Sequence, residues 1–164
     1  MVRILGVDPG SRKVGYGILE CHARQINYVS SGVIRVKPVA HAQRLLQIYQ
    51  CIQSLIMQYQ PHEAAIEQVF VCKNVSSALK LGQARGAILV ACAGLAVFEY
   101  APRAIKKALV GYGQADKLQM QAMIKQVLNL SAHPQEDAAD GLAVAWCQAQ
   151  HRVFAQQLAR ENSE

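Results

Sequence analysis

The sequence lacks several features that mark secreted, membrane or disordered proteins. Its five cysteines are widely spread and include no C-x-x-C pair, which argues against a disulfide framework or a zinc site. The longest apolar run, residues 86–98, is too short to span a bilayer, and Asp8 and Arg12 interrupt any signal-peptide pattern. Charged residues make up only 17% against 52% hydrophobic ones, so a disordered chain is excluded. We expect a cytoplasmic globular protein with no membrane partner.

What the chain does have is length enough for one sizeable core, and an excess of positive charge. At 164 residues, without internal repeats or linkers, it is expected to form a single domain over 1–164, with a polar tail from about 156. The formal net charge is +6. A basic protein of this size favours a polyanionic partner, of which nucleic acid is the most common.

Hydrophobic periodicity predicts an α/β fold. Three strand-like stretches joined by short turns come first, which is the pattern of an antiparallel meander. Helices and two further strands follow, and a strand after a crossover helix is expected to run parallel to an earlier one. The expected strands are 2–7, 13–20, 26–36, 63–67 and 97–100, and the expected helices are 39–60, 74 or 76 to 94, from 102, 114–129 and 134–158. The prediction is a mixed five-stranded sheet, three antiparallel strands then two parallel, flanked by helices.

Four carboxylates are placed where such a fold can bring them together. Asp8 and Glu67 each end an apolar strand, and adjacent strands lie about 4.8 Å apart. Asp137 and Asp140 are three residues apart, so they share one face of the last helix. Acidic residues near a helix N-terminus also stabilise the macrodipole, and this alternative fits the neighbouring Glu136 better than a functional role does.

A cluster of four carboxylates would repel itself unless protons or cations neutralised it. Carboxylate oxygens suit Mg²⁺ or Mn²⁺. Two such ions can activate a water and stabilise the leaving oxygen of a phosphodiester. A basic surface around an acidic centre therefore predicts a metal-dependent nuclease.

Five segments of the sequence resemble one known family, and they occur in the same order. They are Leu5-Gly-Val-Asp8-Pro-Gly-Ser11, Gly15-Tyr-Gly17, Ala65-Ile-Glu67-Gln-Val-Phe70, Ala78-Leu-Lys-Leu-Gly-Gln-Ala-Arg-Gly86 and Asp137-Ala-Ala-Asp140-Gly-Leu-Ala143. On these residues the chain resembles the RuvC Holliday-junction resolvases of bacteria. The resemblance implies an RNase H-like homodimer that makes paired symmetric nicks in four-way DNA junctions, in recombination and repair. It also implies RuvA and RuvB as partners.

The same resemblance assigns roles to individual residues. Asp8, Glu67, Asp137 and Asp140 match the catalytic carboxylates that bind metal, with two Mg²⁺ ions expected per site and Mn²⁺ as a substitute. Two basic residues match groups that assist at the active site, where an ammonium can hold a phosphate: Lys106 and Lys117. Four more residues are candidate DNA contacts: Phe70, Lys73, Lys80 and Arg85.

Alternatives stand beside each of these readings. An actin-like ATPase or sugar kinase also carries an aspartate before a glycine turn, although such proteins use two domains of this kind. A non-catalytic junction-binding module would use the basic surface alone. Phe70 in an apolar run suits a core, and the two lysines suit a solvated helix face. The small-residue stripe of Ala78, Gly82 and Gly86 fits either packing on the sheet or a subunit interface.

Overall fold

The computed structural model describes residues 1–69 and 74–161 of the chain, which form five strands and five helices. The elements follow the order βββαβαβααα, as expected. The strands are β1 (Val2–Asp8), β2 (Lys13–His22), β3 (Gln25–Arg35), β4 (Glu63–Glu67) and β5 (Ala96–Tyr100). The helices are α1 (His41–Tyr59), α2 (Val75–Ala91), α3 (Pro102–Val110), α4 (Lys117–Val127) and α5 (Glu136–Glu161).

The strands form one mixed sheet in the order β3-β2-β1-β4-β5. The first three strands pair antiparallel. Strand β4 then pairs parallel with β1, and β5 pairs parallel with β4. The predicted architecture is therefore confirmed. The crossover through α1 places β4 beside the first strand of the chain, so the carboxyl ends of β1 and β4 lie side by side.

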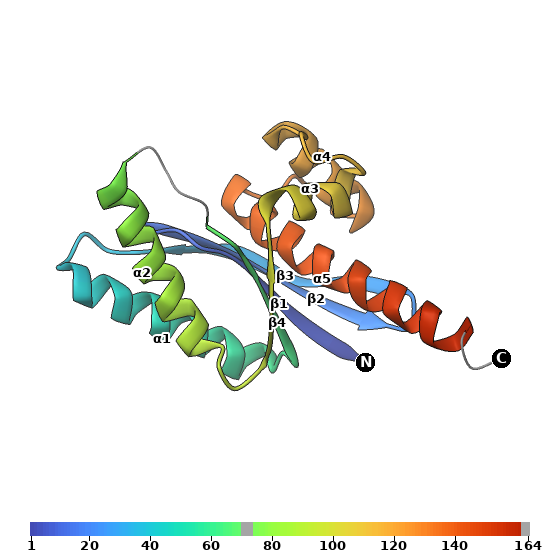
Figure 1. The fold of residues 1–164 in the computed structure, drawn as a ribbon, viewed down its shortest axis with the longest axis horizontal. Coiled ribbons are helices and arrows are strands. Elements are labelled where there is room, and N and C mark those ends of the chain that lie inside the picture. The colour runs from blue at the N-terminus through green and yellow to red at the C-terminus, as the bar shows by residue number, and fades with distance from the viewer. Residues whose placement is uncertain (70–73, 162–164) are drawn as a thin grey trace.

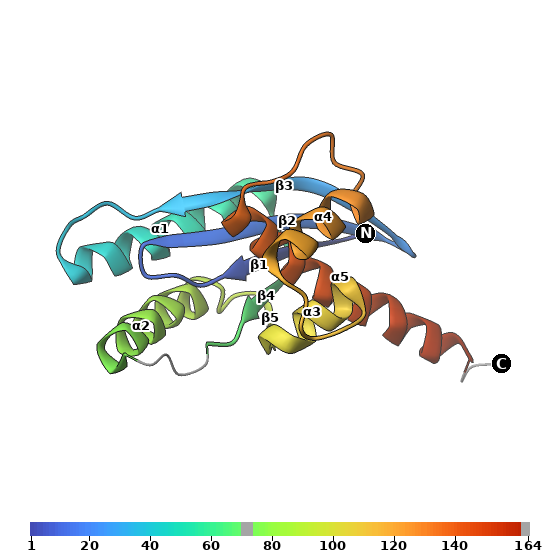
Figure 2. The same ribbon diagram turned by 90° about the horizontal axis from the view of Figure 1, so that it is seen from above.

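Helices cover both faces of the sheet, because its central strands are apolar on both sides (Figure 1). Along β1, Ile4 faces a cluster formed with α3, α4 and α5, whereas Leu5 faces the opposite cluster with α1 and α2. This alternation is what the two-residue period of a strand requires. Figure 2 shows the two helical layers from above, with the C-terminal turns of α5 extending past the strands.

Glycines let α5 lie directly on β1 and β2. A Cβ built at Gly6 would lie 2.3 Å from the backbone nitrogen of Ala145. One at Gly15 would lie 1.8 Å from the carbonyl oxygen of Asp137, and one at Gly141 would lie 2.5 Å from the backbone of Tyr16. The absence of side chains at these positions fixes how closely the N-terminal half of α5 approaches the sheet.

The element ends differ from the expected ones by a few residues. The Asn74 side chain caps α2 by accepting from the Ser77 backbone, and Asp116 caps α4 in a capping box with Gln119. The last helix runs to Glu161, so the expected polar tail is helical over 156–161. Among the described helices, none combines the length and apolar character needed to cross a membrane.

Candidate active site

Two of the four carboxylates end adjacent parallel strands. Asp8 is the last residue of β1, and Glu67 is the last residue of β4. The preceding pair, Val7 and Ile66, are partners in the parallel ladder, so the two acids emerge side by side. The two strands are therefore neighbours, as the convergence expected from the sequence requires.

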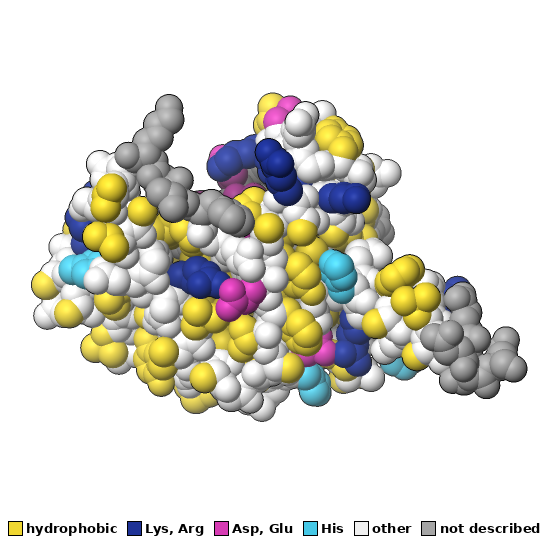
Figure 3. Space-filling view, viewed as in Figure 1, with side chains coloured by type: hydrophobic (Ala, Val, Ile, Leu, Met, Phe, Trp, Pro, Cys, Tyr) yellow, Lys and Arg dark blue, Asp and Glu magenta, His cyan; other side chains and the backbone are white. Residues whose placement is uncertain are grey.

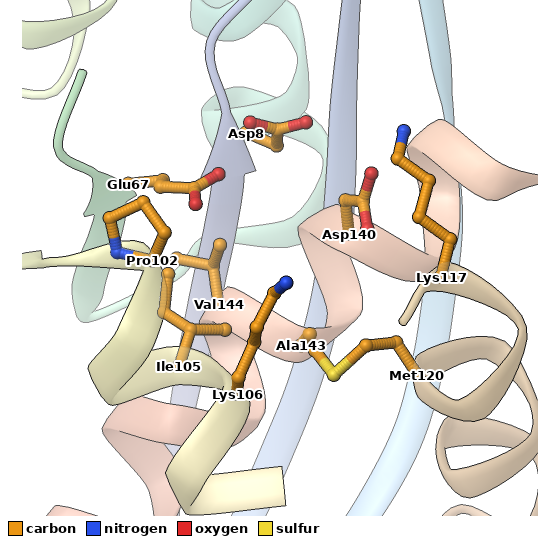
Figure 4. Close-up of a pocket in the computed structure, with 10 residues that line it drawn as sticks. All are labelled: Asp8, Glu67, Pro102, Ile105, Lys106, Lys117, Met120, Asp140, Ala143 and Val144. Atoms are coloured by element: carbon orange, nitrogen blue, oxygen red, sulfur yellow. The ribbon is translucent and has the colours of Figure 1, made fainter. Parts of the chain in front are cut away.

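The other two carboxylates come from the first turns of α5. Asp140 lines a cavity together with Asp8 and Glu67 and points into it (Figure 4), whereas Asp137 is not among the residues that line it. Asp137 lies one turn earlier, where its carboxylate is 3.9 Å from the ammonium of Lys13. The close packing of Gly15 against the Asp137 backbone holds this turn over the start of β2.

A cavity of about 260 Å³ opens between these acids and helices α3 and α4. Figure 4 shows Lys106 reaching from α3 into the middle of this space, and Lys117 of α4 standing beside Asp140. Both lysines predicted from the resemblance are thus brought to the carboxylates. The residues that line the cavity are Asp8, Glu67, Pro102, Ile105, Lys106, Lys117, Met120, Asp140, Ala143 and Val144.

The acids in the cavity hold protons more tightly than free carboxyl groups do. Burial, a hydrogen bond with Glu67 and the charges of Glu67 and Asp137 raise the pKa of Asp8 to about 8. Burial and the charge of Asp8 raise the pKa of Asp140 to about 6. Burial also raises the pKa of Glu67, although its hydrogen bond with Asp8 acts in the opposite direction. The protein thus gathers acids that its own cations neutralise incompletely.

Lys117 has a second carboxylate partner at the rim of the cavity. Its ammonium donates a hydrogen bond to Glu136 Oε1, and this bond raises the pKa of Lys117 and lowers that of Glu136. Both side chains are largely exposed. An exposed ion pair of this kind is weak, so the Lys117 ammonium could exchange Glu136 for a phosphate that enters the cavity.

The donor set fits a divalent cation. Within residues 1–69 and 74–161, no three His, Cys, Asp or Glu side chains already converge in an arrangement that holds a metal ion. Asp8, Glu67 and Asp140 nevertheless line one cavity and supply only oxygen donors, which are the ligands of Mg²⁺ and Mn²⁺. Burial first, and repulsion between neighbouring carboxylates second, raise the pKa values of Asp8 and Asp140. A bound cation would favour the ionised form of these carboxylates.

The four candidate DNA contacts have different outcomes. Phe70 and Lys73 lie outside the described residues. Lys80 is exposed on α2 and free to meet a phosphate. Arg85 is engaged within the protein, because its guanidinium forms an ion pair with Glu99 of β5 and donates to the backbone oxygen of Glu67.

The structure adds two charged residues that the sequence did not assign to the site. Lys13 pairs with Asp137, and Glu136 holds Lys117. The sequence alone favours Glu136 as a charge at a helix N-terminus, because its pairing with Lys117 depends on α4 lying against α5. Lys13 is the first residue of β2. The signal for its pairing is Gly15, two positions later, because a glycine in a strand can indicate that another backbone packs closely there, in this case that of Asp137.

The two helices beside the cavity, α3 and α4, are basic. Helices α3 and α4 carry five basic residues and no acidic one. Figure 3 shows Lys and Arg side chains gathered over this part of the molecule. The basic residues of the two helices are Arg103, Lys106, Lys107, Lys117 and Lys125.

Known proteins that are similar to this chain share one description. The family model for "Crossover junction endodeoxyribonuclease RuvC" matches residues 4–148. A protein of that name from Shewanella frigidimarina is 58% identical over 149 residues, which cover 90% of this chain and 86% of the relative. Another from Marinobacter nauticus is 51% identical over 162 residues, covering 98% and 93% of the two chains.

A solved structure of T. thermophilus RuvC in complex with a Holliday junction substrate superposes with a TM-score of 0.87. It is 29% identical to this chain, and the match covers 94% of this chain and 97% of that one. The mixed sheet is accordingly the RNase H-like one that the resemblance implied. The chain belongs to the RuvC family of crossover junction endodeoxyribonucleases.

Proposed function

We propose that this protein resolves four-way DNA junctions by paired symmetric nicks, through metal-dependent hydrolysis of phosphodiester bonds. Its metal dependence is a property of the RuvC family, and two Mg²⁺ ions per site is the form we propose, with Mn²⁺ as a substitute. The observation that carries the proposal is the cavity in which Asp8, Glu67 and Asp140 meet the ammonium groups of Lys106 and Lys117.

The proposed division of labour follows from the positions of these side chains. Asp8, Glu67 and Asp140 would hold the cations, and Asp137 would join them after giving up its contact with Lys13. Bound divalent ions supply an activated water and stabilise the leaving oxygen. Lys106, which points into the cavity, would hold the scissile phosphate as a compact positive charge.

The basic helices support docking of the junction backbone on the same side. Lys106 of α3 and Lys117 of α4 line the cavity that a DNA strand would enter. Lys80, with Phe70 and Lys73, remains a proposed contact to DNA. Phosphate contacts of this kind release counterions, so junction binding is expected to weaken steeply with salt.

A homodimer is part of the proposal, because two nicks on a two-fold junction call for two active sites related by a two-fold axis. The small residues of α2 support an interface there and not packing on the sheet. A Cβ built at Gly82 or Gly86 would meet nothing within 4 Å. The same helix exposes Val75, Leu79 and Val90 by 64–70%. We also propose RuvA and RuvB as partners and the bacterial cytoplasm as the location.

The deciding experiment incubates the purified protein with a synthetic four-way junction and with a linear duplex of matched sequence. Nicks at symmetric positions are expected in the junction alone, and only when Mg²⁺ is present. Binding without nicking under every metal condition would instead indicate a non-catalytic junction-binding module.

A further inference from the structure

Arg85 is a mostly buried cation that does not line the active-site cavity. Its side chain is only 20% exposed, and it lies on α2 between the core residues Ala84 and Ile88. The terminal nitrogen Nη2 donates to Glu99 Oε2 of β5, and Nε donates to the backbone oxygen of Glu67 at 3.4 Å. One guanidinium therefore bridges α2, the end of β4 and the edge strand.

Arg85 approaches Glu67 from the face of the sheet opposite the active-site cavity. Along β4, Ala64 and Ile66 face the α1–α2 cluster, whereas Ala65 belongs to the cluster on the α5 side. By the same alternation, the Glu67 side chain faces the cavity on the α5 side. Arg85 approaches from α2 on the opposite face and contacts only the backbone of Glu67.

Glu67 needs such support because its strand loses a neighbour at this point. The ladder between β1 and β4 ends at the pair Val7 and Ile66. Beyond it, Glu67 pairs with Tyr100 of β5, and the next residue, Gln68, donates its backbone N–H to the Tyr100 oxygen at 2.8 Å. Arg85 adds a bond to the same short stretch and ties it to Glu99, one residue before Tyr100.

We infer that Arg85 is a positioning residue that fixes the Glu67 carboxylate beside Asp8, and not a contact to DNA. The inference rests on the proposed function, since it concerns the cation-binding role of Glu67. A guanidinium suits the task because it offers several donors in one rigid plane, so it can hold a carbonyl and a carboxylate together. An ammonium also has three donors, but all three are on one nitrogen, so it does not reproduce the separate Nε and Nη2 donors used here.

The test compares Arg85→Lys, Arg85→Met and Glu99→Gln with wild type. Arg24→Lys, at the exposed turn between β2 and β3, serves as the matched control. Mn²⁺ binding is measured by calorimetry without DNA, and junction binding is measured in chelator as a function of salt. Nicking kinetics give kcat and KM separately.

We expect Arg85→Met to weaken Mn²⁺ binding about tenfold, as loss of a group that orients a metal ligand does. Its kcat should fall about 10- to 100-fold, because small displacements of a reacting group are costly. Junction affinity and its salt slope should stay at the wild-type values. Arg85→Lys should lie between the two, and Arg24→Lys should match wild type.

A wild-type Mn²⁺ affinity and kcat in Arg85→Met, with weaker junction binding and a shallower salt slope, would make Arg85 a DNA contact and overturn the inference. Should Arg85→Met fail to fold, Glu99→Gln decides. It leaves an amide that still accepts, so we expect about threefold weaker Mn²⁺ binding. No change in that variant would also overturn the inference. A wild-type protein that nicks no junction would refute the proposed function instead.

Discussion

A hydrogen bond joins the carboxyl groups of Asp8 and Glu67, which end neighbouring parallel strands at the wall of one cavity. Two carboxylates can share a hydrogen bond only if one of them keeps a proton. Burial raises the pKa of both carboxyl groups, that of Asp8 to about 8, so the pair holds a proton at neutral pH. In this state the site is ready to exchange a proton for a cation.

The exchange makes Asp8→Asn a sharp test of catalysis. The amide has the size of the protonated acid but cannot become an anionic ligand, so the variant should bind junctions with wild-type affinity and lose nicking by at least about 100-fold. Gel-shift titration in chelator and a nicking assay with Mg²⁺ measure the two properties. Nicking at the wild-type rate would remove Asp8 from the set of catalytic ligands.

The stability of the metal-free protein should fall as pH rises. Asp8 has a pKa of about 8 in the folded chain against 3.8 in a free side chain. Between these values the native state holds a proton that the unfolded state has lost, so the free energy of unfolding decreases with pH over this window. Asp140, with a pKa near 6, contributes in the same direction over the lower part of it.

Denaturant titrations in chelator at pH 5 and pH 8 measure this loss. Asp8→Asn is the comparison, since its neutral amide does not titrate. The variant should gain stability relative to wild type as pH rises from 5 to 8. A difference between the two proteins that stays constant with pH would contradict the raised pKa of Asp8.

Metal binding should release protons for the same reason. Asp8 and Asp140 must ionise to serve as ligands, so Mg²⁺ affinity should increase from pH 6 to pH 8 and level off above the pKa of Asp8. Calorimetry in two buffers of different ionisation enthalpy counts the protons released. Asp8→Asn should bind Mg²⁺ more weakly and with less dependence on pH. An affinity that is flat over this range in wild type would be inconsistent with protonated ligands.

The close packing of α5 on the sheet can be tested without changing any charged residue. A Cβ at position 15 would lie 1.8 Å from the Asp137 carbonyl oxygen, so Gly15→Ala must push the first turn of α5 away from β2. Overpacking of this kind costs about 1–3 kcal/mol, and it should also abolish most nicking by displacing Asp137 and Asp140. Thermal unfolding and the nicking assay measure both effects.

Gly94→Ala is the matched control for this variant. The added Cβ meets nothing within 4 Å, and the residue lies in the turn before β5, outside the site. Its stability should stay within about 0.5 kcal/mol of wild type, with unchanged nicking. Equal losses in the two variants would mean that the tight approach at Gly15 is not what holds the site.

The strand bounds and the meeting of Asp8 and Glu67 can be predicted from the sequence because they depend on local signals. The bounds of β4 agree with the expected 63–67, since Pro61 precedes the apolar stretch and a carboxylate ends it. The meeting of Asp8 and Glu67 then follows from one rule, that a strand after a crossover helix returns parallel to an earlier one.

Such rules do not predict which partners the long charged side chains bind. The sequence offers Arg85 only as a candidate DNA contact, because its guanidinium meets Glu99 only when β5 forms the edge of the sheet beside β4. Lys117 meets Glu136 because α4 packs on α5. These contacts join segments that no periodicity relates, so they emerge only from the assembled fold.

The exposed face of α2 yields the last prediction, on assembly. Leu79 is 64% exposed and lies one turn from Val75 and close to Gly82, where small residues allow a second helix to approach closely. Leu79→Glu would place a charge in the proposed interface, where it would be desolvated without a partner, so the dimer should dissociate. Light scattering after size exclusion measures the mass, and circular dichroism verifies the fold. Because each protomer carries one copy of the active-site cavity, the monomer should nick single strands and leave few junctions cut in pairs.

Leu158→Glu serves as the control, because that residue is also exposed, by 44%, but lies near the far end of α5 (Figure 1). It should remain dimeric and make paired nicks. A dimer that survives Leu79→Glu and dissociates with Leu158→Glu would move the interface from α2 to α5. The two active sites would then be related through the C-terminal helix, and the spacing between paired nicks would have to be explained from that end of the molecule.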